Sequence, residues 1–165
     1  AHELVREGKE VEIPPRPVTV FNFAVSAIRR EGDFVDVDVR VHCSSGTYIR
    51  SLARDMGEAL GVGGHLTALR REASGPFTLA HARTLDELED NAALSLTLDE
   101  ALTAAWPTLE VSADEYAALA MGKWLAPRGL TGVHAAVGPD GRAVALVKEK
   151  GSRLSTMFVA RPSTL

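Results

Sequence analysis

The sequence predicts an α+β fold, in which part of an antiparallel sheet precedes a small β-barrel-like module. Three patterns support this prediction. Valines alternate with polar residues over 34–43, apolar residues recur at helical spacing over 49–60, and three S/T-x-x-E boxes precede short β patterns in the second half. We place a linker at 91–95, and the expected domains are residues 1–94 and 95–165.

The first elements are a helix end and an antiparallel hairpin. A glycine closes the predicted helix over 1–8, and the prolines within 14–17 favour an extended segment. Strands are predicted over 18–28 and 34–43, joined by a turn at 31–33. One face of the second strand carries only Val35, Val37, Val39, Val41 and Cys43. The hairpin is therefore expected to be buried on one face.

A sharp turn and a helix follow the hairpin. The turn is predicted at Ser44–Gly46 and the helix from Thr47 to Gly61. The apolar stripe of this helix leaves Arg50 on the other side of its first turn, where a positive charge slightly opposes the helix dipole. We therefore expect Arg50 to serve a partner, such as a carboxylate or a phosphate. Residues 65–72 are predicted to return as a strand, which would bring Leu69 back toward the turn.

Helix starts are marked most clearly in the second half. Capping boxes at Thr84–Glu87, Thr97–Glu100 and Ser112–Glu115 each predict a helix start, and Gly122 is the expected end of the third helix. Short strands are then predicted over 132–137, 142–148 and 157–160. A Pro-Asp-Gly turn at 139–141 joins the first two strands.

Composition narrows the class of protein. Hydrophobic residues make up 45% and charged residues 24%, as in a globular protein. No apolar run approaches the roughly 18 residues that a membrane helix needs, and no signal peptide is recognisable. One cysteine allows no internal disulfide, and the five histidines lack the spacing of a metal site. We therefore expect a cytoplasmic protein without a membrane partner or a metal site.

The net charge of −4 hides a segregated pattern. Residues 40–71 hold five arginines and two acidic residues, residues 84–118 hold nine acidic residues and no lysine or arginine, and residues 119–165 hold seven basic and two acidic residues. Phosphate binding depends on local basic surface rather than on net charge. The two basic regions are thus candidate nucleic-acid surfaces, although a solvated acidic helix pair beside scattered basic residues explains the charges equally well.

The segment from Cys43 to Phe77 is the most specific part of the chain. It contains CSSGTYIRSLARDMG, then LGVGGHLTALRR, then GPF. This run closely resembles the third conserved motif of the bacterial tRNA pseudouridine-55 synthases, the TruB family, written C-S-x-G-T-Y-I-R-x-L-x-x-D-x-G, L-G-x-x-x-H-x-x-x-L-R-R and G-x-F. The resemblance implies a catalytic-domain portion over residues 1–94, followed by a PUA-type RNA-binding domain over 95–165.

One family motif is missing from the sequence. The nucleophilic aspartate of the family lies in an upstream G-x-L-D-P-x-A-T-G motif, which no segment of the 165 residues matches. At position 2 the family commonly has tyrosine, whereas this chain has His2. The chain is therefore expected to bind RNA, but not to catalyse the reaction without the missing segment.

The resemblance implies roles for three residues of the active site. Arg50 matches the arginine that pairs with the catalytic aspartate, and a planar guanidinium suits a carboxylate because it binds both oxygens. Tyr48 matches a residue lining the base pocket, with ordinary aromatic packing as the alternative. Leu69 matches the leucine that packs on the extruded base, although a leucine on a strand is most often simply core.

The RNA-binding candidates come partly from the motif and partly from charge. Arg70 and Arg71 are equally well explained as phosphate contacts and as outward strand charges. For His65, a hydrogen bond to backbone or RNA and a purely structural role explain the residue equally well. The full set of expected RNA-binding residues is Arg54, His65, Arg70, Arg71, Lys123, Arg128 and Arg153. The last three are chosen from charge alone.

The function implied by the resemblance is isomerisation of one uridine in the tRNA T-loop to pseudouridine, by a cofactor-free enzyme that acts as a monomer. Two alternatives remain: a stand-alone module that binds RNA without catalysis, and a small-molecule enzyme that uses Cys43. The second is weak, because His42 and Cys43 are neighbours on a strand and point to opposite faces. A small buried thiol explains Cys43 better.

Overall fold

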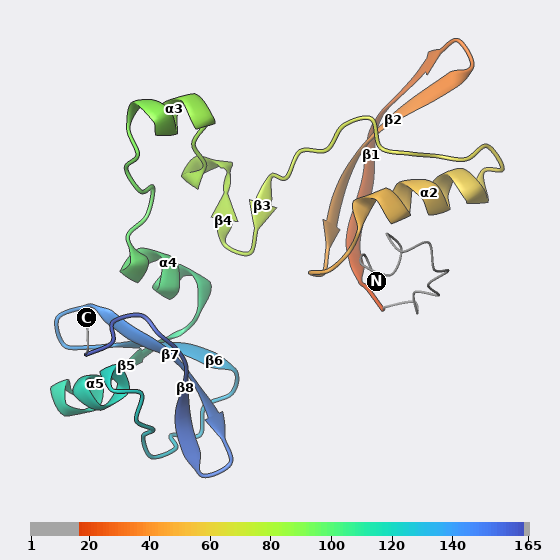
Figure 1. Cartoon of the computed structure of the whole chain (residues 1–165). Helices are drawn as coiled ribbons and strands as arrows, with labels where there is room; N and C mark the ends of the chain where they lie inside the picture. Colours follow the sequence, from red (N-terminus) through yellow and green to blue (C-terminus); the bar gives the residue numbers. More distant parts are fainter. Residues whose placement is uncertain (1–16, 164–165) are drawn as a thin grey trace, which may run out of the picture. The chain divides into compact units, whose positions relative to one another are not determined.

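The computed structural model describes residues 17–163 and divides into two compact units, Ala1–Leu69 (unit 1) and Arg70–Leu165 (unit 2) (Figure 1). Both units combine helices with mainly antiparallel sheets, which confirms the α+β prediction. The helix predicted over 1–8, the prolines before Pro17 and His2 lie outside the described residues. The predicted domain boundary after residue 94 stays a prediction, since the division after Leu69 reflects packing alone.

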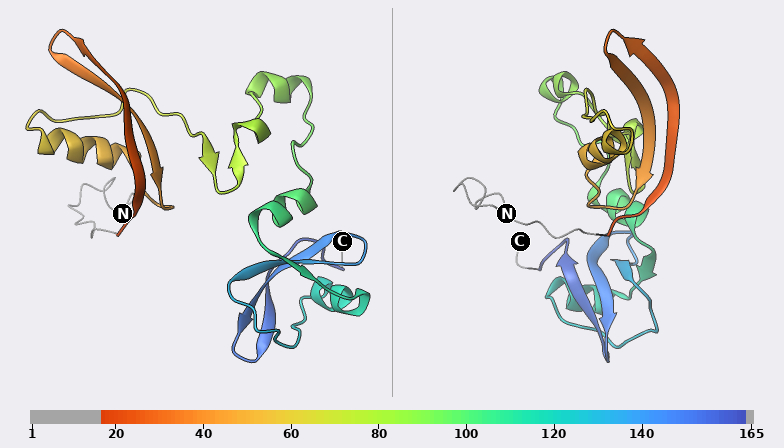
Figure 2. Two further views of the ribbon diagram at one scale, coloured as in Figure 1. Left: turned by 180° about the vertical axis from the view of Figure 1, so that it is seen from behind. Right: turned by 90° about the vertical axis from the view of Figure 1, so that its right-hand side faces the viewer.

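Unit 1 is a long hairpin followed by one helix. Strand β1 (Val20–Glu31) pairs antiparallel with β2 (Phe34–Cys43), and helix α2 (Ile49–Ala59) lies along one side of the hairpin (Figures 1 and 2). Gly32, with φ of 60°, makes the tight connection between the strands. The predicted hairpin and helix are confirmed, although β1 extends to Glu31 and α2 begins two residues later than expected.

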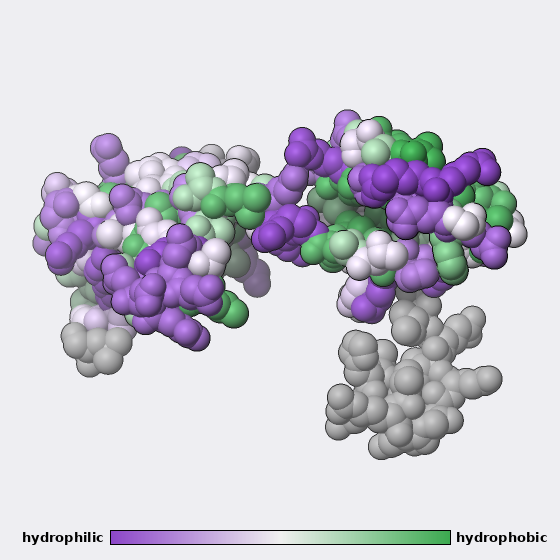
Figure 3. Space-filling view, turned by 90° about the horizontal axis from the view of Figure 1, so that it is seen from above, coloured by the Kyte–Doolittle hydropathy of each residue, from purple (hydrophilic) through white to green (hydrophobic). Residues whose placement is uncertain are grey.

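One face of the hairpin remains largely open in this chain. The expected alternation is present from Val37 to Cys43, where every second residue is half-buried. On the partner strand, however, Val25 and Ile28 of the same face are 51% and 65% exposed. Figure 3 shows apolar patches on the surface of this unit. Gly57 is the only buried residue of unit 1 within the part that the structure describes.

The strand predicted over 65–72 is wrong. After α2 the chain forms a loop, and every residue from His65 to Glu72 except Leu66 is exposed. Gly61 and Gly63, with φ of 74° and 72°, turn the backbone sharply after α2. Among the described residues no strand pairs with residues 65–72, so their backbone groups have no ladder to join. Instead, β3 (Ala73–Ser74) and β4 (Phe77–Thr78) form a very short hairpin in unit 2.

Three capping boxes start the helices of unit 2, as predicted. Helices α3 (Leu85–Asp90), α4 (Leu98–Ala105) and α5 (Ala113–Ala120) each begin after a Ser or Thr whose hydroxyl accepts a backbone N–H, while a Glu carboxylate returns to the cap. A single 3₁₀ turn, η1 (Leu79–His81), precedes them. The predicted linker is the irregular segment between α3 and α4.

A four-stranded sheet forms the centre of unit 2. Its order is β5 (Thr108–Glu110), β6 (Val133–Val137), β7 (Ala143–Lys150) and β8 (Arg153–Val159). The pairs β6–β7 and β7–β8 are antiparallel, whereas β5–β6 is parallel. The three predicted strands are confirmed, with β8 beginning four residues earlier than expected, and β5 is an additional strand.

The sheet and its helices enclose a hydrophobic core. Leu119 of α5 and Val144, Val147 and Leu154 of the sheet are fully buried. A second cluster joins Leu102 of α4 to the other side of the sheet. All buried hydrophobic residues of the described chain lie in unit 2.

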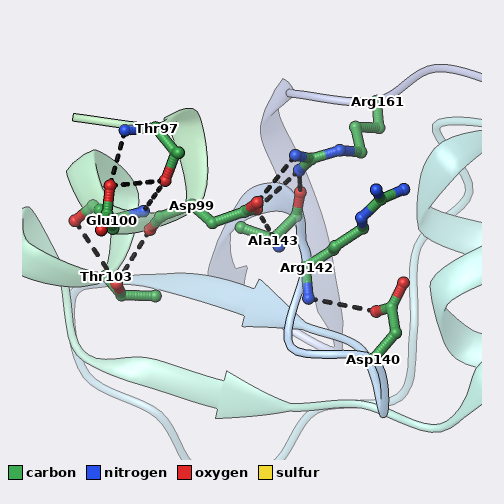
Figure 4. A network of polar contacts seen from close by, with 8 residues as sticks. All are labelled: Thr97, Asp99, Glu100, Thr103, Asp140, Arg142, Ala143 and Arg161. Atoms are coloured by element: carbon green, nitrogen blue, oxygen red, sulfur yellow. Dashed lines mark hydrogen bonds and ion pairs between the residues drawn. The ribbon is translucent and has the colours of Figure 1, made fainter. Parts of the chain in front are cut away.

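An ion pair between the half-buried side chains of Asp99 and Arg161 joins α4 to the sheet (Figure 4). Both carboxylate oxygens of Asp99 accept hydrogen bonds from the Arg161 guanidinium, at 2.7 and 2.9 Å, and one also accepts from the Ala143 N–H at 2.7 Å. Partial burial raises the pKa of Asp99, but the hydrogen bonds from Arg161 and Ala143 outweigh burial and hold this pKa below its ordinary value.

Candidate functional site

The strand-to-helix bend of unit 1 is fixed by a few local hydrogen bonds. The backbone N–H of Ser44 donates to the Thr19 carbonyl at 2.8 Å, and the Thr19 N–H donates to the Ser44 hydroxyl at 3.0 Å. The Thr47 hydroxyl donates to the Ser44 carbonyl at 2.8 Å. Gly46, with φ of 81°, reverses the chain between them. These bonds set where α2 begins relative to the end of β2.

The N-terminus of α2 is not closed by its own residues. Its N-cap is Tyr48, whose side chain makes no capping hydrogen bond, and its first turn has no acidic residue. The first N–H groups of a helix normally need such partners, and their positive end favours an anion. The helix start is therefore open to a negatively charged group.

Arg50 lies at this open helix start. Its guanidinium is 4.7 Å from the centroid of the Tyr48 ring, and the Tyr48 side chain is 58% exposed. Within residues 17–163 no carboxylate forms an ion pair with Arg50, which is exposed. The cation–π contact orients the guanidinium without neutralising it. A carboxylate or phosphate brought to this bend would meet both Arg50 and the helix N-terminus.

The motif glycine Gly57 and the nearby Gly64 have a packing role that the sequence did not reveal. A Cβ atom at Gly57 would lie 2.1 Å from the Gly63 carbonyl carbon, and one at Gly64 would lie 2.5 Å from the Ala53 carbonyl oxygen. The loop after α2 thus lies directly against the helix, because both positions lack a side chain. The spacing of these glycines was the available signal, but only the tertiary contact explains it.

The other predicted residues of unit 1 lie on its surface. Arg54 forms an ion pair with its neighbour Asp55, with donor–acceptor distances of 2.7 and 2.9 Å. The hydrogen bonds that Arg54 donates to Asp55, together with the negative charge of Asp55, raise the pKa of Arg54. His65 is exposed in the loop, and Leu69 is 66% exposed at the end of the unit. Within unit 1, Tyr48 and Arg50 contact each other, whereas His65 and Leu69 are exposed on the surface.

The predicted residues of unit 2 fall into two groups. Arg70, Arg71, Lys123 and Arg153 are exposed, and the Arg153 guanidinium lies 4.7 Å from the centroid of the Trp124 ring. Arg128 instead has several hydrogen-bond partners within the chain. Neither the pairing of Arg153 with Trp124 nor the fixing of Arg128 was predicted.

Arg128 is held by acidic residues and by backbone. Its guanidinium bonds to the Glu115 carboxylate and, at 2.9 Å, to the Glu110 carbonyl, while its N–H donates to the Glu149 carboxylate. The hydrogen bond from Arg128, with one from the Ser112 backbone, lowers the pKa of Glu115. These contacts fix the loop before β6, and direct RNA binding by Arg128 stays a prediction.

The structure gives no support to a thiol site. Cys43 is half-buried, whereas His42 is exposed on the opposite face and stacks near Phe21, with ring centroids 4.9 Å apart. Across residues 17–163 no group of three or more His, Cys, Asp or Glu side chains is arranged to hold a metal ion. No helix in that range is long and apolar enough to cross a membrane.

Comparison with known proteins places the whole chain in one group. Three family models match consecutive segments: TruB family pseudouridylate synthase (N terminal domain) over residues 1–49, tRNA pseudouridylate synthase B C-terminal domain over 50–110, and tRNA Pseudouridine synthase II, C terminal, over 106–161. The first boundary falls inside the motif, between Ile49 and Arg50.

Several curated relatives are similar over the full chain. Proteins named tRNA pseudouridine synthase B are 68% identical in Corynebacterium aurimucosum and 69% identical in Corynebacterium efficiens, each over 165 residues. The one from Rhodococcus jostii is 55% identical over 166 residues. The chain is covered completely in all three, and it spans 56%, 56% and 54% of the relatives' lengths.

Two solved structures resemble the fold. A chain of an H/ACA RNP bound to a substrate RNA containing 2'-deoxyuridine matches 98% of this chain and 60% of its own length, with a TM-score of 0.70 and 27% identity. A chain of a Cbf5-Nop10-Gar1 complex matches 94% of this chain and 56% of its own length, with a TM-score of 0.71 and 26% identity. With consecutive family models and relatives this similar, the chain belongs to the TruB family of pseudouridine synthases.

Proposed function

We propose that this chain supplies one wall of the active site of a tRNA pseudouridine synthase and part of its RNA-binding surface. The reaction is isomerisation of one uridine in the T-loop of tRNA. The glycosidic bond from the sugar to the ring nitrogen breaks, the uracil turns, and a bond from the same sugar carbon to C5 forms. The C5 proton leaves and the ring nitrogen takes up a proton, so the composition of the base is unchanged.

A single observation supports this proposal most strongly: at an uncapped helix start, Arg50 has no carboxylate partner among residues 17–163. An aspartate nucleophile in an apolar pocket would take up a proton unless a positive charge compensated it. Arg50 and the α2 N-terminus provide that compensation for an aspartate from a segment outside this sequence. Arg50 acts here by holding the aspartate ionised and aimed at the sugar.

Two exposed apolar residues fit the base pocket. The target base must leave its stack to be reached, which costs a few kcal/mol and requires stacking and apolar surfaces. Tyr48, oriented by Arg50, and Leu69 are this chain's proposed contributions to the pocket. Both side chains are more than half exposed, at 58% and 66%, and therefore have surface left to cover a base.

Basic surface residues are proposed to position the tRNA T-arm. They are Arg54, His65, Arg70, Arg71, Lys123, Arg128 and Arg153, and Arg128 also stabilises its own loop. The four-stranded sheet of unit 2, with capped helices and its own core, fits the PUA-type domain that we propose for residues 95–165. We expect the enzyme to be a cytoplasmic monomer.

The test is made in the complete enzyme, which includes the segment with the G-x-L-D motif. We expect Arg50→Ala to lower turnover by about 10²–10³-fold, the scale for losing one stabilising charge or donor, with little change in tRNA affinity. Arg50→Lys should recover part of the activity, since it keeps the charge without the planar fork. Release of tritium from C5 of the uridine measures turnover, and filter binding measures affinity.

Arg30→Ala is the matched control, because it removes an exposed arginine from the same unit at the far end of β1. Its turnover should equal that of the unmodified enzyme. Near-normal turnover in Arg50→Ala would contradict the assigned role. Loss of tRNA affinity in parallel with turnover would show that Arg50 only binds RNA.

A further inference from the structure

Trp124 and three basic residues share one outward face of the unit 2 sheet. In the β7–β8 ladder Lys148 pairs with Ser155 and Lys150 pairs with Arg153, and directly paired residues point to the same side of a sheet. The pair between them is Glu149 with Leu154, and Leu154 is fully buried. Lys148, Lys150 and Arg153 therefore point away from the core cluster that contains Leu154.

A β-bridge brings Trp124 to the same face. Leu125 exchanges two backbone hydrogen bonds with Leu154, at 2.9 and 3.0 Å, and packs with it against the core. The neighbouring residue, Trp124, consequently points outward beside Arg153, whose guanidinium is 4.7 Å from the indole centroid. We call the surface formed by Trp124, Lys148, Lys150, Arg153 and Ser155 the Trp124 face.

The positive charges of this face are not neutralised within the described chain. No carboxylate among residues 17–163 forms an ion pair with Lys148, Lys150 or Arg153. Glu149, the one acidic residue in this part of β7, points to the other side. There its carboxylate accepts the N–H groups of the loop from Arg128 to Leu130, which lower its pKa. The charged side chains of the Trp124 face are thus all basic.

Trp124 is exposed to an unusual degree for its size. Its exposed fraction is 52%, although large aromatic residues are mostly buried. The guanidinium of Arg153 covers part of the ring and fixes its orientation, which reduces the entropy lost when a ligand stacks on it. An oriented, exposed indole stands here among cations that form no ion pair within residues 17–163. This combination suits unpaired nucleotides, because bases stack on the ring while phosphates contact the charges.

We propose that the Trp124 face binds a single-stranded segment of RNA. One unpaired base stacks on the Trp124 indole, and Lys148, Lys150 and Arg153 contact the phosphates on either side of it. The proposal rests on the proposed function in assuming an RNA substrate, and it adds a contact made by an unpaired nucleotide other than the target uridine. Trp124 is then a positioning residue for the substrate and takes no part in the isomerisation.

The experiment uses the 165-residue chain with Trp106→Phe, which leaves Trp124 as the only tryptophan. Its fluorescence is titrated with a single-stranded RNA nonamer, a blunt RNA duplex of equal length and inorganic polyphosphate. We expect quenching by the single strand, clearly weaker binding of the duplex, and no quenching by polyphosphate. Labelled-RNA anisotropy then measures the affinities of the variants.

Three variants separate stacking from charge. Trp124→Ala should weaken single-strand binding by about 5- to 150-fold, whereas Trp124→Phe should retain most of it. The double variant Lys148→Ala, Lys150→Ala should reduce the slope of log affinity against log salt by about 1.4. Arg142→Ala, which removes an exposed charge just before β7, is the matched control and should leave the salt slope unchanged.

The outcomes distinguish this proposal from the enzymatic one. If tRNA is bound and converted by the complete enzyme while Trp124 responds to no RNA, the Trp124 proposal is overturned and the proposed function stands. Quenching by anionic phospholipid vesicles instead of RNA, or an unchanged affinity in Trp124→Ala, overturns it as well. If Trp124 responds as expected but the complete enzyme converts no uridine, only the proposed function fails.

Discussion

The two units differ in how many of their apolar and polar groups find partners within the same unit. Unit 2 holds all the buried hydrophobic residues of the described chain, and its three helices begin with capping boxes that its own side chains complete. Within residues 17–69, by contrast, one glycine is the only buried residue, the hairpin keeps an open apolar face, and α2 starts without a cap. We therefore expect unit 2 to be stable on its own and unit 1 to bind partners.

The largest expected effect tests the core of unit 2. Leu154→Ala should lower the free energy of unfolding of this unit by about 2–5 kcal/mol, because Leu154 is fully buried among sheet and helix residues. The matched control is Leu60→Ala in unit 1, whose side chain is 67% exposed and whose loss should cost less than about 0.5 kcal/mol.

Urea titration measures the effect of Leu154→Ala, with tryptophan fluorescence as the signal. Trp106 and Trp124 both lie in unit 2, so fluorescence reports the unfolding of that unit alone. Leu60 lies in unit 1, so the cost of Leu60→Ala is measured by hydrogen exchange of the β1, β2 and α2 amides. A cost equal to that of Leu154→Ala would contradict the contrast between the units.

The second expected effect concerns the ion pair between Asp99 and Arg161. Asp99→Asn should destabilise unit 2 by about 1.5–3 kcal/mol at neutral pH, because it weakens charge-assisted hydrogen bonds at a site mostly shielded from water. The folded-state pKa of Asp99 is lowered, so its contribution is fully present above the ordinary aspartate pKa of about 3.9 and disappears as the pH falls through the folded value.

Chemical denaturation across a pH series checks this prediction. The stability gap between the unmodified chain and Asp99→Asn should be constant near neutrality and should narrow below about pH 3.9. Asp90→Asn, at an exposed position of the same unit, serves as the control and should behave like the unmodified chain. A gap that persisted unchanged in acid would assign the effect to packing instead of charge.

The third expected effect concerns the packing of the loop after α2 against that helix in unit 1. Gly57→Ala should destabilise this unit by about 1–3 kcal/mol, since the added methyl group would lie 2.1 Å from the Gly63 backbone. At an ordinary exposed helix position the same change would stabilise by up to about 1 kcal/mol. The sign of the effect is therefore diagnostic.

Hydrogen exchange of the β1, β2 and α2 amides measures the stability of unit 1 separately. Glu58→Ala, at the next and exposed position, is the control and should leave exchange rates nearly unchanged. Slower exchange in Gly57→Ala would show that the loop does not rest on the helix.

Local signals explain most of what could be predicted from the sequence. The alternation in β2 and the three capping boxes depend on residues within a few positions of one another, and the structure confirms them. The failures are non-local. The strand β5 pairs in parallel with residues about 27 positions later in the chain, as in Thr108 with Ala135, and no nearby pattern marks it.

The candidate site shows the same limit. The motif was sufficient to single out Tyr48 and Arg50, which the structure brings together at the bend. It gave no indication that Arg128 would meet Glu115 and Glu149, because those contacts join residues 13 and 21 positions apart. The charge of a residue is visible in a sequence, whereas the partner that neutralises it is decided by the fold.

The most direct test of the central claim, that Arg50 keeps an aspartate from outside this sequence ionised, is the pH dependence of turnover in the complete enzyme. An adjacent guanidinium lowers a carboxyl pKa by about 1–3 units, so Arg50→Gln should move the acidic limb of the kcat profile upward by a similar amount. We predict that shift, with the limb unmoved in Arg30→Ala. An acidic limb at the same pH in Arg50→Gln and in the unmodified enzyme would contradict the account.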